Sequence, residues 1–179
     1  AMGYINVDNL ENILCAVAAA KLSNCPQEAI AQVLATFGGV RHRTQFVRDW
    51  QGRKIYNDSK ATNVLATKSA LSAFTAPIVL LAGGLDRGHS FEELREDMKG
   101  VKGVVAFGET ALRFIEFAKS CGVEHIVRAI DVEDAVGYAA KMSEAGDIIL
   151  LSPACASWDQ HESFEIRGDL FIERVMKLS

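Results

Sequence analysis

Apolar residues recur along this chain in two alternating patterns. Short runs that are almost entirely apolar, such as residues 78–82 and 148–151, are typical of strands buried on both faces. Longer stretches such as 132–142, with apolar residues every three or four positions, are typical of helices packed along one side. The alternation predicts an α/β fold of the Rossmann-like, doubly wound type, with a mostly parallel sheet covered by helices on both faces.

The first 38 residues do not follow this alternation. Two helices are predicted at 9–22 and 26–37, and Gly38-Gly39 ends the second one. Because both precede any strand, we assign residues 1–38 to a neighbouring structural unit and residues 39–179 to the sheet domain. Ala1-Met2-Gly3 resembles a vector-derived leader, and we expect it to play no part in the fold.

The sheet domain is predicted to open with an antiparallel hairpin. Strands 44–49 and 53–57 flank Trp50-Gln51-Gly52, a turn of hairpin length. Ser90 with Glu93 fits a capping box, and Asp131 stands where a helix N-cap is expected. The remaining predicted elements are helix 63–73, strand 78–82, helix 91–98, strand 104–107, helix 110–120, strand 126–129, helix 132–142, strand 147–151 and helix 167–178.

Composition excludes several classes of function. A net charge of −4 and the lack of any basic run disfavour nucleic-acid binding. The apolar stretches are too short to span a bilayer, so we expect no membrane segment. The cysteines form no CxxC pair and no metal-like spacing with the histidines, which favours reduced, structural thiols in the cytoplasm.

The densest candidate chemistry follows the strand at 53–57. Asp58, Ser59, Lys60, Thr62 and Asn63 place a carboxylate, two hydroxyls, an ammonium and an amide within six residues. Thr62 or Asn63 alone would be explained as a helix cap, and Lys60 alone as a solvated side chain. Capping needs one such residue and not five, so the cluster predicts a ligand site at the carboxyl end of a strand.

Three other loops carry weaker signals. Residues 83–89 follow a buried strand, and their glycines allow close backbone approach while Arg87 and His89 offer donors to an anion, although a simple tight turn explains the glycines equally well. In residues 152–160 small side chains leave room for a ligand, and Cys155 is better explained by packing than as a nucleophile. His42-Arg43 stands at the entry to the sheet. Together these cations favour an anionic small molecule.

Several of these stretches resemble one protein family. Residues 57–63, Gly83-Gly84, 151–160 and 164–169 are similar to the C-terminal part of the Mur ligases, in the branch that adds D-glutamate to UDP-N-acetylmuramoyl-L-alanine in peptidoglycan precursor synthesis. Branches that add later amino acids carry DNPR, whereas this chain has SPACAS at 152–157. Residues 8–12 resemble the end of the family's central ATPase domain, with Asp8 in place of the usual histidine.

The resemblance implies an ATP- and Mg²⁺-dependent amide synthesis through an acyl phosphate. Arg87 stands where some members carry lysine. The arginine keeps the positive charge and adds a guanidinium that can bind a carboxylate through two parallel hydrogen bonds. The residues implied for D-glutamate are Lys60, Thr62, Arg87, Ser157 and the Phe164 backbone. Those implied for ATP are Asn9 and Asn12 near the adenine, Arg43 near the phosphate, Asp58 near the ribose, and His42.

Parts of such a ligase are missing from these 179 residues. The phosphate-loop pattern GxxxxGK[ST] does not occur, and neither do the family's magnesium ligands or its UDP-sugar domain. We therefore expect an inactive part of a larger ligase, which needs its N-terminal and central domains in cis. One alternative is a stand-alone Rossmann-like nucleotide-binding regulatory module, but the glycine fingerprint of such a module is absent from residues 58–63. The other alternative is a folylpolyglutamate-type ligase domain, and the SPACAS sequence at 152–157 argues against it.

Overall fold

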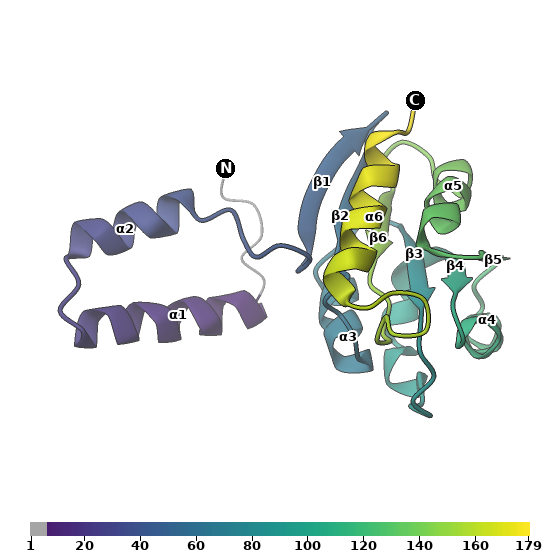
Figure 1. The fold of residues 1–179 in the computed structure, drawn as a ribbon, viewed down its shortest axis with the longest axis horizontal. Helices are drawn as coiled ribbons and strands as arrows, with labels where there is room; N and C mark the ends of the chain where they lie inside the picture. The colour runs from purple at the N-terminus through teal and green to yellow at the C-terminus, as the bar shows by residue number, and fades with distance from the viewer. Residues whose placement is uncertain (1–6) are drawn as a thin grey trace. The chain divides into compact units, whose positions relative to one another are not determined.

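The chain divides into two compact units, and the boundary along the sequence falls between Gly39 and Val40. The computed structural model describes residues 7–179, with side chains from Leu10 onward, so the predicted vector-derived residues 1–3 lie outside it. The first unit consists of helix α1 (Val7–Leu22) and helix α2 (Gln27–Thr36), which lie beside one another (Figure 1). Both predicted helices are confirmed. Their apolar side chains are poorly covered, and Leu14 and Phe37 are 58% and 62% exposed.

The second unit is built on a six-stranded sheet in the order β1-β2-β6-β3-β4-β5. Strand β1 runs antiparallel to β2, and the other neighbouring strands are parallel, so the predicted mixed sheet is confirmed. Trp50 lies in β1, and the turn is only Gln51-Gly52, both with positive φ as two-residue hairpin turns require. The strands are β1 (Gln45–Trp50), β2 (Arg53–Asn57), β3 (Ile78–Gly83), β4 (Val101–Phe107), β5 (His125–Arg128) and β6 (Ile148–Leu151).

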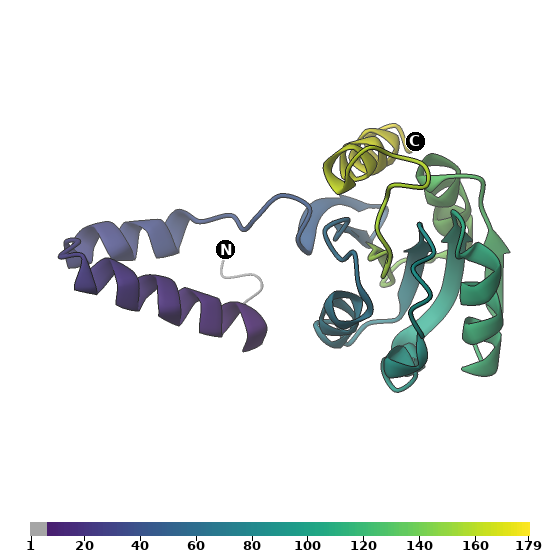
Figure 2. The same cartoon turned by 60° about the horizontal axis from the view of Figure 1, so that its bottom comes forward.

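Helices cover both faces of the sheet, as predicted. Side chains alternate along each strand, so Ile78 and Leu80 of β3 face one layer while Val79 and Leu81 face the other. Figures 1 and 2 show the two layers on opposite sides of the sheet. The first layer contains α3 (Val64–Ser72) and α4 (Ala111–Ser120), and the second contains α5 (Val132–Met142) and α6 (Phe164–Met176).

The predicted helix 91–98 is wrong. The chain there forms two short 3₁₀ segments, Glu92–Leu94 and Asp97–Gly100, closed by i→i+3 hydrogen bonds. Strand β4 begins at Val101, three residues earlier than predicted. The capping box is wrong as well, because the Ser90 hydroxyl accepts a hydrogen bond from the Glu92 N–H at 3.2 Å and no α-helix follows.

Three helices of the sheet domain begin at a side-chain cap. The carboxylate of Asp131 accepts from the Asp134 N–H at 2.8 Å, which confirms the predicted N-cap of α5, and Asn63 caps α3. Ser163 caps α6, so this helix begins at Phe164, three residues before the predicted start. Among the described residues no helix is long and apolar enough to cross a bilayer.

Strand order decides which loops meet. Strand β6 lies between β2 and β3, and all three are parallel, so their carboxyl ends share one edge of the sheet. The loop after β6 is thereby placed between the loop that begins at Asp58 and the loop that begins at Gly84. This return of the last strand into the middle of the sheet creates the crevice in which open α/β sheets bind ligands.

Candidate functional site

The loop after β2 is fastened to helix α6 through Asn57. The Asn57 amide nitrogen donates to the Gly168 carbonyl at 3.1 Å and lies 3.0 Å from Nδ1 of His42. Its amide oxygen accepts from the Ser59 N–H at 3.0 Å. Because Asn57 and Ser59 are fully buried, these bonds are shielded from water and fix the backbone that presents Lys60 and Thr62.

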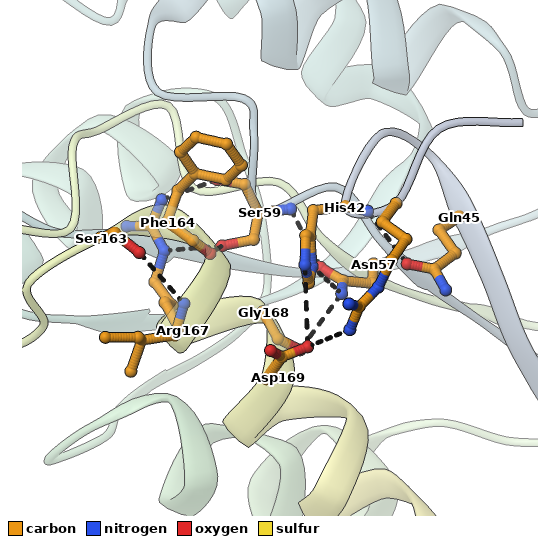
Figure 3. A network of polar contacts seen from close by, with 11 residues as sticks. His42, Gln45, Asn57, Ser59, Ser163, Phe164, Arg167, Gly168 and Asp169 are labelled. Atoms are coloured by element: carbon orange, nitrogen blue, oxygen red, sulfur yellow. Dashed lines mark hydrogen bonds and ion pairs between the residues drawn. The ribbon is translucent and has the colours of Figure 1, made fainter.

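His42 belongs to the same network (Figure 3). Since Asn57 donates to Nδ1, the ring hydrogen resides on Nε2, which faces the Asp169 carboxylate at 3.7 Å. Burial lowers the pKa of His42, and Asp169 only partly opposes that effect. The His42 imidazole, implied above for ATP, is thus a buried neutral group that joins the segment before β1 to α6. The neighbouring Arg41 forms an ion pair with Asp169 at 2.6 Å.

Asp58, implied above for the ribose, points into the protein. One carboxylate oxygen accepts from the Thr44 N–H at 3.0 Å and the other accepts from the Ser152 hydroxyl at 2.8 Å. Burial raises the pKa of Asp58 to about 6, although these hydrogen bonds and the charge of exposed Arg43 oppose the rise. The carboxylate therefore joins the loops after β2 and β6, and it titrates close to neutral pH.

Arg167 is the functional candidate that sequence reasoning missed. Its guanidinium is fully buried, and Nε donates to the Ser59 hydroxyl at 3.0 Å while Nη2 donates to the carbonyls of Ser59 and Cys155 at 2.9 and 3.1 Å. Nη1 has no hydrogen-bond partner among the described residues. Burial lowers the pKa of Arg167 to about 10. An arginine in an amphipathic helix is ordinarily expected at the surface, so the sequence carried no signal for this bridge between two loops.

The residues implied for D-glutamate fall in two adjoining groups. Thr62 and Arg87 line one small hollow, together with Ala156 from the loop after β6. The ammonium of Lys60 lies 4.6 Å from the centroid of the Phe164 ring, at the start of α6. Residues from four separate segments of the sequence are therefore brought to the same edge of the sheet.

Ser157 occupies the loop between these groups. It is 2% exposed, and its hydroxyl has no hydrogen-bond partner among the described residues. A buried hydroxyl without a partner costs about 1–3 kcal/mol, and native proteins keep few of them outside sites that use them. Ser157 is therefore poised to bond a group that enters from outside the chain.

The glycines after β3 serve packing within the chain. Gly83 and Gly84 have φ of +125° and +145°, and a Cβ would overlap the Phe107 carbonyl oxygen at the first and the Ala156 carbonyl oxygen at the second. Leu85 also donates its N–H to the Ala156 carbonyl at 2.9 Å. The close backbone approach that we expected at these glycines is thus made by Phe107 and Ala156 of the same chain. The loop that follows Gly84 therefore presents Arg87 from a rigid backbone.

Cys155 fits the packing interpretation. Its thiol is buried, lies 3.5 Å from the Thr110 hydroxyl, and has a pKa raised by burial. A protonated thiol in this setting is a poor nucleophile. A larger hollow of about 560 Å³ opens beyond β4 and β5, between Gly108 and Ile130, and it contains none of the residues singled out above.

The residues implied for ATP are divided between the two units. His42, Arg43 and Asp58 belong to the sheet domain, whereas Asn9 and Asn12 lie on α1 in the first unit. Asn12 is exposed, and the side chain of Asn9 lies outside the described part of the chain. Among the described residues no cluster of three His, Cys, Asp or Glu side chains fits a metal ion.

Comparison with known proteins gives concordant matches. The family described as "Mur ligase, glutamate ligase domain" matches residues 42–155. The chain is 56% identical over 170 residues to the UDP-N-acetylmuramoylalanine--D-glutamate ligase of Bacillus pumilus and 59% identical over 171 residues to that of Geobacillus kaustophilus. Each match covers 95% of this chain and 38% of the relative, so the chain spans well under half the length of these proteins.

A solved structure shares the fold at low sequence identity. The UDP-N-acetylmuramate-alanine ligase of Thermotoga maritima aligns over 94% of this chain and 38% of that chain, with a TM-score of 0.65 and 14% identity. At that identity the likeness concerns the fold alone.

Proposed function

This chain belongs to the Mur ligase family, and on that premise we propose that it is the C-terminal part of a ligase that joins D-glutamate to UDP-N-acetylmuramoyl-L-alanine. The relatives named above carry that activity in their names and support this choice of substrates. The reaction would serve peptidoglycan precursor synthesis in the cytoplasm. ATP with Mg²⁺ would supply the leaving group by converting the substrate carboxylate to an acyl phosphate.

The observation that carries the proposal is the meeting of unpaired donors at one edge of the sheet. Arg87 and Thr62 line the same hollow as Ala156, and the next residue in the chain is Ser157, whose hydroxyl has no partner among the described residues. D-glutamate carries two carboxylates joined by a short carbon chain, so it suits a site with a cation at one end and hydroxyl or backbone donors at the other. We assign Arg87 and Thr62 to one carboxylate, and Ser157 with the Phe164 N–H to the other.

The remaining residues would orient the amine and the nucleotide. Held by both carboxylates, D-glutamate would present its amino group to the acyl phosphate, and this positioning lowers the entropic part of the barrier. Lys60, above the Phe164 ring, would add a further positive charge for the D-glutamate carboxylates. Exposed Arg43 would meet negative charge that develops on phosphoryl oxygens. Arg167 and Asp58 would keep the loops after β2 and β6 in register.

We further infer that residues 1–38 are the end of the central ATPase domain. Exposed apolar side chains on both helices, Leu14 and Val33 among them, support a surface that is covered by another part of the full-length protein. The isolated chain is then not a catalyst.

Kinetics of the full-length enzyme test the site assignment. Arg87→Ala and Ser157→Ala should each raise the KM for D-glutamate, Arg87→Ala by the equivalent of about 2 kcal/mol, while the KM for ATP changes much less. An unchanged KM and rate in both variants would remove this site. A loss confined to ATP would move the residues to the nucleotide side.

A separate measurement tests the fragment. The purified 179-residue chain should release no phosphate from ATP above background, because it carries no phosphate loop. Steady phosphate release that disappears in Lys60→Ala would contradict the proposal that this part alone is inactive.

A further inference from the structure

Arg87 presents its guanidinium without an acidic partner. The adjacent Asp86 carboxylate pairs with Arg113 and accepts from the Gly88 N–H at 2.8 Å, so it is turned away from Arg87. Arg113 also donates to the His89 carbonyl at 2.7 Å, which anchors the far end of the loop. Within residues 7–179 Arg87 makes no hydrogen bond and no ion pair. Its side chain is held instead by the ring of Trp158, whose centroid lies 4.7 Å from the guanidinium carbon.

This manner of holding an arginine matters chemically. A carboxylate partner would occupy the N–H edge of the guanidinium, which is the edge that binds substrate carboxylates bidentately. An aromatic ring occupies the planar face and leaves the five N–H donors free. The Trp158 stack thus restricts the rotamers of Arg87 without competing for its hydrogen bonds.

Trp158 has no evident structural reason to be where it is. The side chain is 64% exposed, although an indole buries a large apolar area when it packs in a core. It directly follows Ser157, whose buried hydroxyl lacks a partner, so one short loop presents both the ring that holds Arg87 and the second donor of the site. Because the indole contributes little to the core, replacing it should leave the fold intact.

We propose that Trp158 is a positioning residue for D-glutamate, whose ring holds the Arg87 guanidinium by its face and directs the N–H edge toward a substrate carboxylate. The inference rests on the proposed function of the same site and adds a residue to it. It also explains the suitability of arginine at position 87, because a planar guanidinium stacks on an indole more completely than an ammonium does.

The test is a double-mutant cycle in the full-length ligase. Trp158→Leu should raise the KM for D-glutamate about threefold to fivefold, as expected for an exposed cation–π contact, and leave kcat and the KM for ATP nearly unchanged. Trp158→Phe should restore most of the loss. In an Arg87→Ala background, Trp158→Leu should have no further effect on the KM, because the guanidinium that the ring holds is gone.

A matched pair elsewhere in the chain provides the control. The Arg53 guanidinium lies 4.8 Å from the Trp50 ring centroid at the β1–β2 hairpin, so Trp50→Phe alters the same kind of stack away from the site. It should not change the KM for D-glutamate. The purified 179-residue chain contains two tryptophans, so Trp50→Phe leaves Trp158 as its single tryptophan, and Arg87→Ala should then alter the tryptophan emission of this chain without any substrate.

The outcomes separate the two proposals. If Arg87→Ala leaves the KM for D-glutamate unchanged, the proposed site itself is wrong. If Arg87→Ala raises the KM but Trp158→Leu does not, or if Trp158→Leu raises it equally in the Arg87→Ala background, the positioning role of Trp158 is refuted while the site stands.

Discussion

Replacing Asp58 with asparagine should stabilise the sheet domain at neutral pH and weaken its response to pH. The carboxylate is buried between the Thr44 N–H and the Ser152 hydroxyl. An asparagine oxygen can still accept from Thr44, and the Ser152 hydroxyl can rotate to accept from the new amide nitrogen. The substitution therefore keeps the shape and both hydrogen bonds while removing a buried charge.

The magnitude follows from the pKa of Asp58, which burial raises from 3.8 to about 6. The folded state binds this proton more tightly than the unfolded state, so the associated stability is fully present below about pH 3.8 and is lost as the pH rises through about 6. The gap between the two pKa values corresponds to about 3 kcal/mol at pH 7. We expect Asp58→Asn to recover about 1–3 kcal/mol of unfolding free energy at pH 7 and very little at pH 4.

Urea denaturation of the 179-residue chain between pH 4 and pH 8 provides the measurement. His42 titrates in the same range with the opposite sign, because burial lowers its pKa and its contribution is lost as the pH falls below 6.5. Comparing variant with parent at each pH cancels that contribution. A variant less stable than the parent at pH 7, or a difference that stays constant from pH 4 to pH 8, would refute the reasoning.

Three further changes test other parts of the structure. Arg167→Ala should lower the unfolding free energy of the sheet domain by about 3 kcal/mol or more in urea denaturation. Arg167→Met, which fills much of the same space, should lower it by less. Equal losses in the two variants would mean that the volume of the Arg167 side chain does not contribute to stability. Gly84→Ala should lower the midpoint of thermal unfolding followed by circular dichroism, because a Cβ would meet the Ala156 carbonyl, whereas Gly122→Ala, with open space at the same sign of φ, should cost less. Removing residues 1–39 should leave cooperative unfolding of the rest, and its loss would show that the unit boundary is misplaced.

The sequence determined the elements whose signals are local. The apolar run of β3, the amphipathic repeat of α5 and the Asp131 cap each depend on residues a few positions apart, so their patterns identified them correctly. Where local signals were ambiguous, they misled. Phe91, Leu94 and Met98 have helical spacing and are all buried, but two short 3₁₀ segments are enough to bury them.

The tertiary structure alone decided which loops meet and what their side chains face. Strand β6 enters between β2 and β3 because its apolar side chains find partners on both sides there, a choice made by contacts between residues 94 and 70 positions apart. Only that insertion buries Arg167 beneath two loops, leaves the Ser157 hydroxyl without a partner and sets Trp158 against Arg87. The sequence named the polar residues of the site, but burial and partnership are long-range properties, and no local pattern encodes them.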